Sequence, residues 1–343
     1  MPAVSILLPT FNRAAFIPQA LASIRSQTWT DWELVVVDDG STDDSAELIE
    51  ACRREMAQPV QLIRQQNQGA YAARNRAVDA ASGRFVAFFD SDDIWLPEYL
   101  STCVKALESN GDVDWVYVSC RIVDLASQRV VSPDTFINDG APRPFRRLKT
   151  QERGSLRVID DPDAVSCALR HGFYSGLQNS VMRASVFAPA RFRTPYRNEA
   201  EDQLFVIRAL KRGVRFGYID AVLVQYHVHD ANSSGAATHQ TTERQRRLLE
   251  LVIRGLEDLR HEVALDRRER RVLSRRLQRE YFWHLGYSVL WTSGLQDAAM
   301  RAYRRGLREW PWSVSCWKTY AAAAVRSWLG RGPSERSGDA QVR

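Results

Sequence analysis

Short apolar strands alternate with helical patterns over the first 118 residues, and this alternation limits the possible folds more than any other feature. Almost every position in these strands is apolar, rather than every second one. Strands of this kind are typical of a parallel sheet covered by helices on both faces. We therefore expect an α/β fold with a mostly parallel sheet. The expected strands are residues 4–8, 33–37, 60–63, 85–89 and 113–118, and the expected helices are residues 14–26, 43–54, 70–81 and 97–108.

Polar residues follow three of these strands at the point where each strand ends. They occupy positions 9–12, 38–41 and 90–93. Ligands of parallel sheets bind outside the carboxyl ends of the strands, so the three clusters together predict one site. No Gly-x-Gly-x-x-Gly follows the first strand, and the chain has no Gly-x-x-x-x-Gly-Lys. This argues against a dinucleotide-dependent dehydrogenase and a phosphate-loop NTPase.

Three carboxylates, Asp90, Asp92 and Asp93, come directly after the strand at 85–89. Carboxylates this close repel one another unless a cation offsets their charge. A Mg²⁺ or Mn²⁺ ion held by one or two carboxylates and by substrate phosphates is the usual solution. The alternative is that Asp92 or Asp93 caps a helix beginning near residues 95–97. The position of Asp90 at a strand end, beside the other clusters, favours the metal.

The acidic segment at residues 38–44 has a mixed role. Gly40 and Ser41 suit a turn, and Ser41 or Asp43 suits the N-cap of the next helix. A carboxylate at the strand end could also accept hydrogen bonds from a base or a ribose. Asp39 is our candidate for that contact.

Four motifs follow one another in a specific order, and they are Val4–Asn12, Val37–Asp43, Asn67–Gly69 with Ala73–Asn75, and Phe89–Asp93. This order resembles glycosyltransferase family 2, whose members are inverting enzymes of the GT-A fold. The resemblance is close over roughly residues 3–100. It implies that the Asp-x-Asp pair of the family is Asp90 and Asp92, with Asp92 as the direct ligand of Mn²⁺ or Mg²⁺. The nucleotide-sugar-binding residues that it implies are Pro9, Thr10, Asn12, Asp39, Asn67, Gly69, Arg74, Asp90 and Ser91.

The same resemblance implies an acceptor-activating carboxylate in a Glu-Asp pair that opens a helix. Glu201 and Asp202 match, at the start of a helix expected at residues 199–211. Inversion requires one base to take the proton of the acceptor hydroxyl, and a metal stabilises the departing diphosphate. We expect Asp202 to be the base, with Glu201 as the alternative. Taken alone, both could be first-turn carboxylates stabilised by the helix dipole.

Downstream, Tyr226–Ser234 resembles the closing Tyr-Arg-x-His segment of the family. The resemblance implies that His229 completes the metal shell or contacts the diphosphate. His227 stands where the family commonly has Arg, so a cation there would depend on the protonation of His227. Aromatic residues that could stack on a sugar ring are Trp95, Phe173, Tyr174 and Tyr196, although aromatic residues at the margins of a sheet more often serve packing.

The whole chain divides into three expected regions. Residues 1–238 are expected to form the GT-A domain, with an irregular hairpin or flap at about 122–158, a return to regular structure at 178–182 and a strand pair near Phe216–Tyr226. Residues 239–330 form a helical extension, and a tetratricopeptide-like hairpin is expected within it. Residues 331–343 are expected to be a disordered tail. The expected helices of the extension are residues 243–262, 267–291, 296–309 and 312–329.

The net charge of +6 is unevenly placed. Residues 243–343 carry 21 Arg and Lys against 12 Asp and Glu, whereas residues 1–242 carry 26 against 29. The basic extension suggests an anionic partner, either a membrane or a polyanion. A set of well-solvated arginine-rich helices explains the charge equally well. No nucleic-acid-binding module is recognisable, which argues against that class of partner, and the oligomeric state stays open.

No stretch approaches the roughly 20 apolar residues that cross a bilayer, and no signal peptide is expected at the N-terminus. The five cysteines are scattered, as expected for reduced thiols in the cytosol. We expect a cytoplasmic protein that associates peripherally with the inner face of the membrane through its basic helices.

The expected reaction is inverting transfer of a monosaccharide from a nucleotide diphosphate sugar, with UDP-sugars favoured, to a saccharide or lipid-linked acceptor. Polysaccharide and cell-envelope biosynthesis is the expected setting. A sugar-phosphate nucleotidyltransferase is the first alternative, but the Gly-rich basic loop of that class is absent after the first strand. An inactive scaffold with a partner-binding helical tail is the second, and the intact Asp90/Asp92 and Glu201/Asp202 pairs argue against it.

Overall fold

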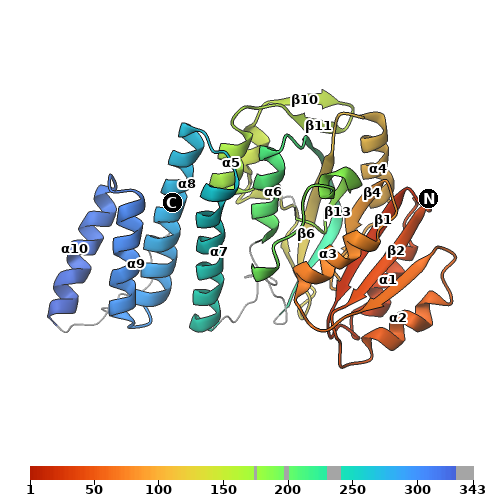
Figure 1. Ribbon diagram of the computed structural model, residues 1–343, viewed down its shortest axis with the longest axis horizontal. Coiled ribbons are helices and arrows are strands. Elements are labelled where there is room, and N and C mark those ends of the chain that lie inside the picture. Colours follow the sequence, from red (N-terminus) through yellow and green to blue (C-terminus); the bar gives the residue numbers. More distant parts are fainter. Residues whose placement is uncertain (174–175, 197–200, 230–240, 330–343) are drawn as a thin grey trace. The chain divides into compact units, whose positions relative to one another are not determined.

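The computed structural model describes residues 1–173, 176–196, 201–229 and 241–329 (Figure 1). The chain forms two compact units, Met1–Thr238 and His239–Arg343. The first unit contains one large mixed sheet and the second is helical. The disordered tail expected at 331–343 lies outside the described residues.

The N-terminal half of the sheet is parallel, as the apolar strands predicted. Its strands run in the order β3-β2-β1-β4, and each is followed along the chain by a helix or by the acidic turn at residues 90–93. The strands are β1 (Val4–Thr10), β2 (Trp32–Asp38), β3 (Val60–Arg64) and β4 (Phe85–Phe88), and the helices are α1 (Ile17–Arg25), α2 (Ser45–Arg53), α3 (Ala70–Ala80) and α4 (Tyr99–Ser109).

The sheet continues beyond β4 with antiparallel and parallel neighbours, in the order β12-β6-β13-β11-β10. Because β12 is antiparallel to both β4 and β6, the sheet is mixed rather than uniformly parallel. The bounds are β6 (Trp115–Asp124), β10 (Thr150–Arg153), β11 (Leu156–Ile159), β12 (Ser180–Arg183) and β13 (Phe216–Val228), with the short strands β5 (Ile94–Trp95) on β13 and β7 (Val130–Ser132) on β6 and a separate pair, β8 (Ile137–Asn138) with β9 (Ala141–Pro142).

The strand pair expected near Phe216–Tyr226 is wrong, because β13 is one continuous strand of 13 residues. It runs parallel to β6 and absorbs two register shifts, between Ile219 and Val222 and between Val222 and Val224. Such bulges bend a strand without ending it. The continuous path carries the segment from the sheet core to His229, which follows its last residue. Helices α5 (Ala164–His171) and α6 (Glu201–Lys211) complete this unit, and α5 falls where no helix was expected.

Alternate residues of the strands serve two separate cores. On one face, Ile6 and Leu8 of β1 belong to the same buried cluster as Ile24 of α1 and Leu100 of α4. On the other face, Phe205 of α6 packs on aromatic side chains that point away from that cluster. Each fully buried aliphatic or aromatic side chain contributes roughly 1.5–3 kcal/mol. The helices therefore cover both faces of the sheet.

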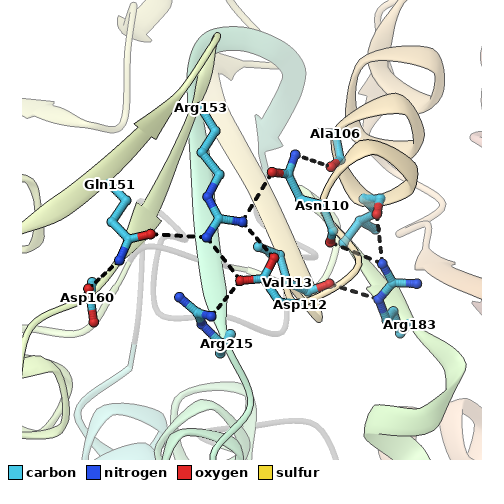
Figure 2. A network of polar contacts seen from close by, with 10 residues as sticks. Ala106, Asn110, Asp112, Val113, Gln151, Arg153, Asp160, Arg183 and Arg215 are labelled. Carbon is cyan, nitrogen blue, oxygen red and sulfur yellow. Dashed lines mark hydrogen bonds and ion pairs between the residues drawn. The ribbon is translucent and has the colours of Figure 1, made fainter.

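A polar network lies at the other end of the sheet, beside the amino ends of β6 and β13. Figure 2 shows Arg153 of β10 donating to both carboxylate oxygens of Asp112, at 2.6 and 3.0 Å, and Arg215 donating to Oδ2 at 2.5 Å. Arg183 of β12 donates to the carbonyl of Val113 at 2.8 Å. The hydrogen bond from Arg153 is the main reason that the pKa of Asp112 falls to about 2.

The second unit is built from α7 (Thr242–Glu262), α8 (Arg267–Arg279), a π-helical stretch η4 (Glu280–Trp291), α9 (Gln296–Glu309) and α10 (Val314–Trp328). A capping box between Asp266 and Glu269 starts α8. Helices η4 and α9 pack closely, since a Cβ at Gly286 would lie 2.8 Å from the ring of Tyr303. None of the helices in the described part of the chain is long and apolar enough to span a bilayer.

Candidate active site

A cavity of about 440 Å³ opens at the carboxyl ends of β1, β2 and β4. Parallel neighbours end at one edge of the sheet, so the polar clusters that follow them meet there. The residues predicted from the sequence that line this cavity are Pro9, Thr10, Asp39, Asn67, Gly69, Arg74, Asp90, Ser91, Asp92 and Asp202.

Asp39 organises the wall of the cavity that faces β2. Its Oδ1 accepts from the side chain of Gln65 at 2.8 Å and from the amide of Gln68 at 2.9 Å, and its Oδ2 accepts from the amide of Gly69 at 2.7 Å. Gly69 has φ of +95°, a conformation that glycine adopts without strain. The carboxylate therefore fixes the loop that leads into α3 while lining the cavity itself.

Asn12 does not line this cavity. Its side-chain oxygen accepts from the amide of Thr42 at 2.8 Å, and its own amide donates to the hydroxyl of Ser41 at 2.9 Å. The residue thus ties the loop after β1 to the loop after β2. The structure gives Asn12 a positioning contact rather than a place on the cavity wall.

Arg74 of α3 and Asp90 form an ion pair of 2.7 Å inside the cavity. The arginine side chain is 9% exposed and lies 5.2 Å from the centre of the Tyr71 ring. Burial alone would lower the pKa of Arg74, but the charges of Asp90 and Asp202 outweigh this effect and raise it. A permanent cation therefore interacts with two of the predicted site carboxylates.

Asp92 and His229 meet at the mouth of the site, with Asp92 Oδ2 3.1 Å from His229 Nε2. The ring of His229 stacks on Phe16 at 5.0 Å. Burial alone would raise the pKa of Asp92, but the hydrogen bond from His229 and the charge of Arg13 lower it. The tertiary structure thus brings together two residues that were predicted as ligands of one ion.

The pair fits a divalent ion held partly by substrate. Among the described residues, no group of three or more His, Cys, Asp or Glu side chains is arranged to hold a metal. However, two adjacent ligands of an octahedral ion with bonds of about 2.1 Å lie about 3 Å apart, close to the separation of Asp92 Oδ2 and His229 Nε2. Mg²⁺ and similar ions commonly take one or two protein ligands and complete their shell with phosphates and water.

Asp93 is not a helix cap, and this interpretation is wrong. Helix α4 begins only at Tyr99, with β5 in between, and its N-cap residue is Glu98. The Oδ1 atom of Asp93 instead accepts from the amide of His227 at 3.1 Å. Burial and the neighbouring carboxylates Asp92 and Asp90 raise the pKa of Asp93 well above its usual range.

His227 is buried and does not line the cavity. Its Nδ1 lies 2.6 Å from the carbonyl oxygen of Asp92, and its Nε2 lies 2.8 Å from the amide nitrogen of Gln225. A carbonyl only accepts and an amide nitrogen only donates, so these contacts assign the neutral tautomer with hydrogen on Nδ1. His227 therefore braces the acidic turn at residues 90–93.

A second cavity of about 330 Å³ shares Gln178, Asp202 and Tyr226 with the first. Asp202 opens α6 and belongs to the lining of both. The Oδ1 atom of Asp202 is buried and has no hydrogen-bond partner among the described residues. The residue thus presents an unoccupied acceptor atom where the two cavities meet.

Glu201 belongs to neither cavity lining. Its buried carboxylate pairs with the guanidinium of Arg208 and accepts from the amide of Arg193 at 2.8 Å. The helix turns two neighbouring carboxylates in different directions, since successive side chains lie about 100° apart around its axis. Glu201 anchors the first turn of α6, and Asp202 faces the site.

Tyr71 is a site residue that the sequence reasoning missed. Its hydroxyl forms a hydrogen bond with the carboxylate of Asp202. Burial raises the pKa of Asp202, Arg74 lowers it, Asp90 raises it and the bond from Tyr71 lowers it, with a net increase. Residues three apart on a helix share a face, so the position of Tyr71 three residues before Arg74 was an available signal.

The four aromatic residues considered for sugar stacking lie in different surroundings. Trp95 is buried in the core, with its ring 4.7 Å from Phe89, so its assignment to sugar stacking is wrong. Phe173 lines the second cavity. Tyr174 and the side chain of Tyr196 lie outside the described residues.

Comparisons with known proteins agree with this architecture. The family model described as Glycosyl transferase family 2 matches residues 5–182. Putative glycosyltransferase EpsH of Bacillus subtilis is 32% identical over 233 residues, 66% of this chain and 61% of EpsH. The Escherichia coli UDP-Glc:alpha-D-GlcNAc-diphosphoundecaprenol beta-1,3-glucosyltransferase WfgD is 34% identical over 121 residues, 35% of this chain and 47% of WfgD. The chain thus spans less than two thirds of either relative.

Two solved structures share the fold. S. aureus TarS 1–349 in complex with UDP-GlcNAc superposes with a TM-score of 0.59 at 18% identity, covering 96% of this chain and 92% of TarS. Mannosyltransferase PcManGT from Pyrobaculum calidifontis in complex with GDP-Man and Mn²⁺ gives a TM-score of 0.54 at 19% identity, covering 96% and 83%. The expected GT-A architecture, followed by a helical region, is confirmed.

Proposed function

This chain belongs to glycosyl transferase family 2, and on that premise we propose that it is an inverting glycosyltransferase. The donor is a nucleotide diphosphate sugar and the acceptor is a saccharide or a lipid-linked saccharide. The proposed setting is the synthesis of a polysaccharide or another component of the cell envelope.

One observation carries the proposal: Asp202 lines the cavity at the strand ends and also the cavity beside it. A single-displacement transfer needs a base between donor and acceptor. The unpartnered Oδ1 atom of Asp202 supplies an acceptor at that junction. Burial raises the pKa of Asp202, and a base with a pKa closer to neutrality accepts a proton more readily.

The larger cavity suits the donor. Asp39 and the loop at Asn67–Gly69 offer polar contacts for a nucleoside, next to Pro9 and Thr10 of β1. The Oγ1 atom of Thr10 is buried without a hydrogen-bond partner in the described structure, as expected for a group that binds a ligand. UDP-sugars are the favoured donors, since TarS binds UDP-GlcNAc.

Asp92 and His229 would hold Mn²⁺ or Mg²⁺, with Asp90 beside them. When bound, such an ion supplies positive charge to the diphosphate as it departs. Arg74 adds a permanent cation on the same side of the cavity, because its ion pair with Asp90 keeps the guanidinium near the Asp-x-Asp motif.

In the proposed reaction, the acceptor hydroxyl gives its proton to Asp202 while the hydroxyl oxygen attacks the anomeric carbon of the donor sugar. The bond from that carbon to the diphosphate oxygen breaks, and the new glycosidic bond forms on the opposite face of the sugar. The smaller cavity suits the acceptor: Phe173 and Val206 offer apolar contacts and His171 and Gln203 offer polar ones. The name of WfgD specifies a diphosphoundecaprenol-linked acceptor, which supports an acceptor of that class here.

The test combines binding and turnover. A panel of UDP-, dTDP- and GDP-sugars, each with and without Mn²⁺, would be screened by thermal shift, since a bound ligand raises the unfolding temperature. The stabilising donor would then be used in transfer assays with saccharide and lipid-linked acceptors. We expect Asp202→Asn to bind this donor as the wild type does and to transfer at least about a hundredfold more slowly.

Asp44→Asn is the matched control, because Asp44 is an exposed aspartate outside both cavities. Full transfer by Asp202→Asn would rule out Asp202 as the base. If no nucleotide sugar raises the unfolding temperature, with or without Mn²⁺, the proposed donor class is ruled out.

A further inference from the structure

Helix α10 packs on the second unit through only a narrow part of its surface. Cys316 and Ala323 are its only buried residues, and Gln278 of α8 donates to Cys316 Sγ at 2.6 Å. The hydroxyl of Tyr320 also accepts a hydrogen bond of 2.9 Å from Arg304 of α9. One face of α10 is therefore fixed against its own unit.

The opposite face of α10 carries large apolar side chains that are exposed. At about 100° per residue, they fall within a stripe roughly 80° wide, pointing away from Cys316 and Ala323. Trp328 is 86% exposed, and Trp312, just before the helix, is 78% exposed. We call this surface the tryptophan stripe, and its residues are Trp312, Val314, Trp317, Val325 and Trp328.

The surroundings of the tryptophan stripe are basic. Lys318 borders the stripe on α10, Arg326 is exposed about 100° further round the helix, and α10 contains no acidic residue. On the neighbouring helix, Arg301 and Arg308 are exposed. The carboxylate nearest in sequence, Glu309, is already paired with Arg260. An apolar face with tryptophan and a basic border is the pattern of a helix that lies in the interface of an anionic membrane.

Two other occupants fit this surface less well. A second copy of the chain would bring an equally basic border against the first, and juxtaposed like charges oppose association. The chain's own residues 330–343 contain a single large aliphatic residue, Val342, and more basic than acidic residues. They offer neither the apolar area nor the negative charge that the tryptophan stripe would match.

We propose that the tryptophan stripe docks on the surface of an anionic lipid bilayer. The tryptophan rings enter the headgroup region, where an indole keeps an apolar body and a polar N–H. Lys318 contacts the lipid phosphates, and Arg326 adds to the electrostatic attraction of the helix within a Debye length of the surface. The chain lies on the bilayer without crossing it. The inference rests on the second unit alone and does not require the proposed transfer reaction.

The test is sedimentation of the full chain with large unilamellar vesicles. One set contains phosphatidylcholine alone and the other contains phosphatidylcholine with phosphatidylglycerol. We expect binding to the phosphatidylglycerol vesicles, weakening as the salt concentration rises. The double variants Val325→Ser/Trp328→Ser and Lys318→Glu/Arg326→Glu should each bind at least about tenfold more weakly.

Two control variants carry the same chemical changes elsewhere on the surface. Val131→Ser alters an exposed valine of β7, and Lys105→Glu reverses an exposed lysine of α4. Both should bind vesicles as the wild type does, and all variants should keep the wild-type unfolding temperature. The proposal is overturned if the wild type ignores phosphatidylglycerol vesicles or if the stripe variants bind them normally. It is also overturned if sedimentation velocity shows self-association that the stripe variants abolish, because a second copy would then be the occupant.

Discussion

The hydroxyl of Tyr71 forms a hydrogen bond with the carboxylate of Asp202, across 131 positions of sequence. The same hydroxyl accepts from the amide of Glu201 at 3.2 Å, so Tyr71 holds the first turn of α6. Arg74, three residues along the same helix, joins Asp202 to Asp90 electrostatically. Helix α3 thus couples the proposed base to the proposed donor site.

Removing the Tyr71 hydroxyl should shift the pH dependence of transfer. The bond from Tyr71 lowers the pKa of Asp202, against burial and Asp90, which raise it. In Tyr71→Phe the pKa of Asp202 should rise further, so the base is protonated up to a higher pH. The acidic limb of kcat/KM should therefore move to higher pH, while the plateau at alkaline pH falls by less than about tenfold.

The matched control for Tyr71 is Tyr99→Phe. The Tyr99 hydroxyl is buried in α4 and has no partner among the described residues. Its removal should leave the pH profile unchanged. An unmoved acidic limb in Tyr71→Phe would contradict the coupling.

Asp92→Ala should abolish the metal dependence of donor binding. It removes one of the two side chains that fit a shared ion, and His229 alone is a weak site. Apparent Mn²⁺ affinity in the presence of UDP should fall by at least about a hundredfold. Mn²⁺ titrations followed by thermal shift would measure this, with Asp44→Ala as a control. Unchanged Mn²⁺ affinity would remove Asp92 from the ligand set.

Asp39→Asn should weaken both the fold and the nucleoside contact. The carboxylate accepts three hydrogen bonds, two of them from the backbone of the loop before α3. An amide offers one acceptor oxygen, so it leaves a buried backbone N–H facing an NH₂ group. We expect the free energy of unfolding in urea to fall by about 1–3 kcal/mol. Asp44→Asn should leave it unchanged, and equal stabilities would refute the bracing role of Asp39.

Gly83→Ala should destabilise the junction of β1 and β4. A Cβ at this buried position would lie 2.6 Å from the amide nitrogen of Ser5 and 2.8 Å from the carbonyl carbon of Val4. Backbone atoms cannot move aside without disturbing the sheet, so the cost should be about 1–3 kcal/mol. Gly111→Ala is the control, because a Cβ there meets nothing within 4 Å. Chemical denaturation compares the two.

Acid should weaken the polar network of Asp112 with Arg153 and Arg215. The hydrogen bond from Arg153 depresses its pKa to about 2, from an ordinary value of 3.8. The pair therefore stabilises the fold fully above pH about 4, and this contribution is lost as the pH falls towards 2. Asp112→Asn should be less stable than the wild type near neutrality, with the difference shrinking below pH 4. Melting temperatures across this range would show it, and a constant difference would contradict it.

The local parts of the site were predictable from the sequence. Strand ends and turns depend on neighbouring residues, so Asp39, Asp90 and Asp92 could be assigned to one edge of the sheet. Because neighbouring parallel strands end at the same edge of the sheet, the clusters that follow them are expected to meet there. The same reasoning failed for Asp93, because a helix cap and a bridge to His227 look alike until β13 is in place.

Sequence by itself determined the parallel half of the sheet, the family motifs and the acidic pair that opens α6, because each is written in residues a few positions apart. Tertiary structure alone decided which of Glu201 and Asp202 faces the cavities, that His229 meets the carboxylate of Asp92 while His227 meets its backbone carbonyl, and that Tyr71 bonds to Asp202. It also decided which apolar residues of α10 stay exposed. These outcomes depend on the direction of side chains across contacts between distant segments, and packing sets that direction only once the whole unit has formed.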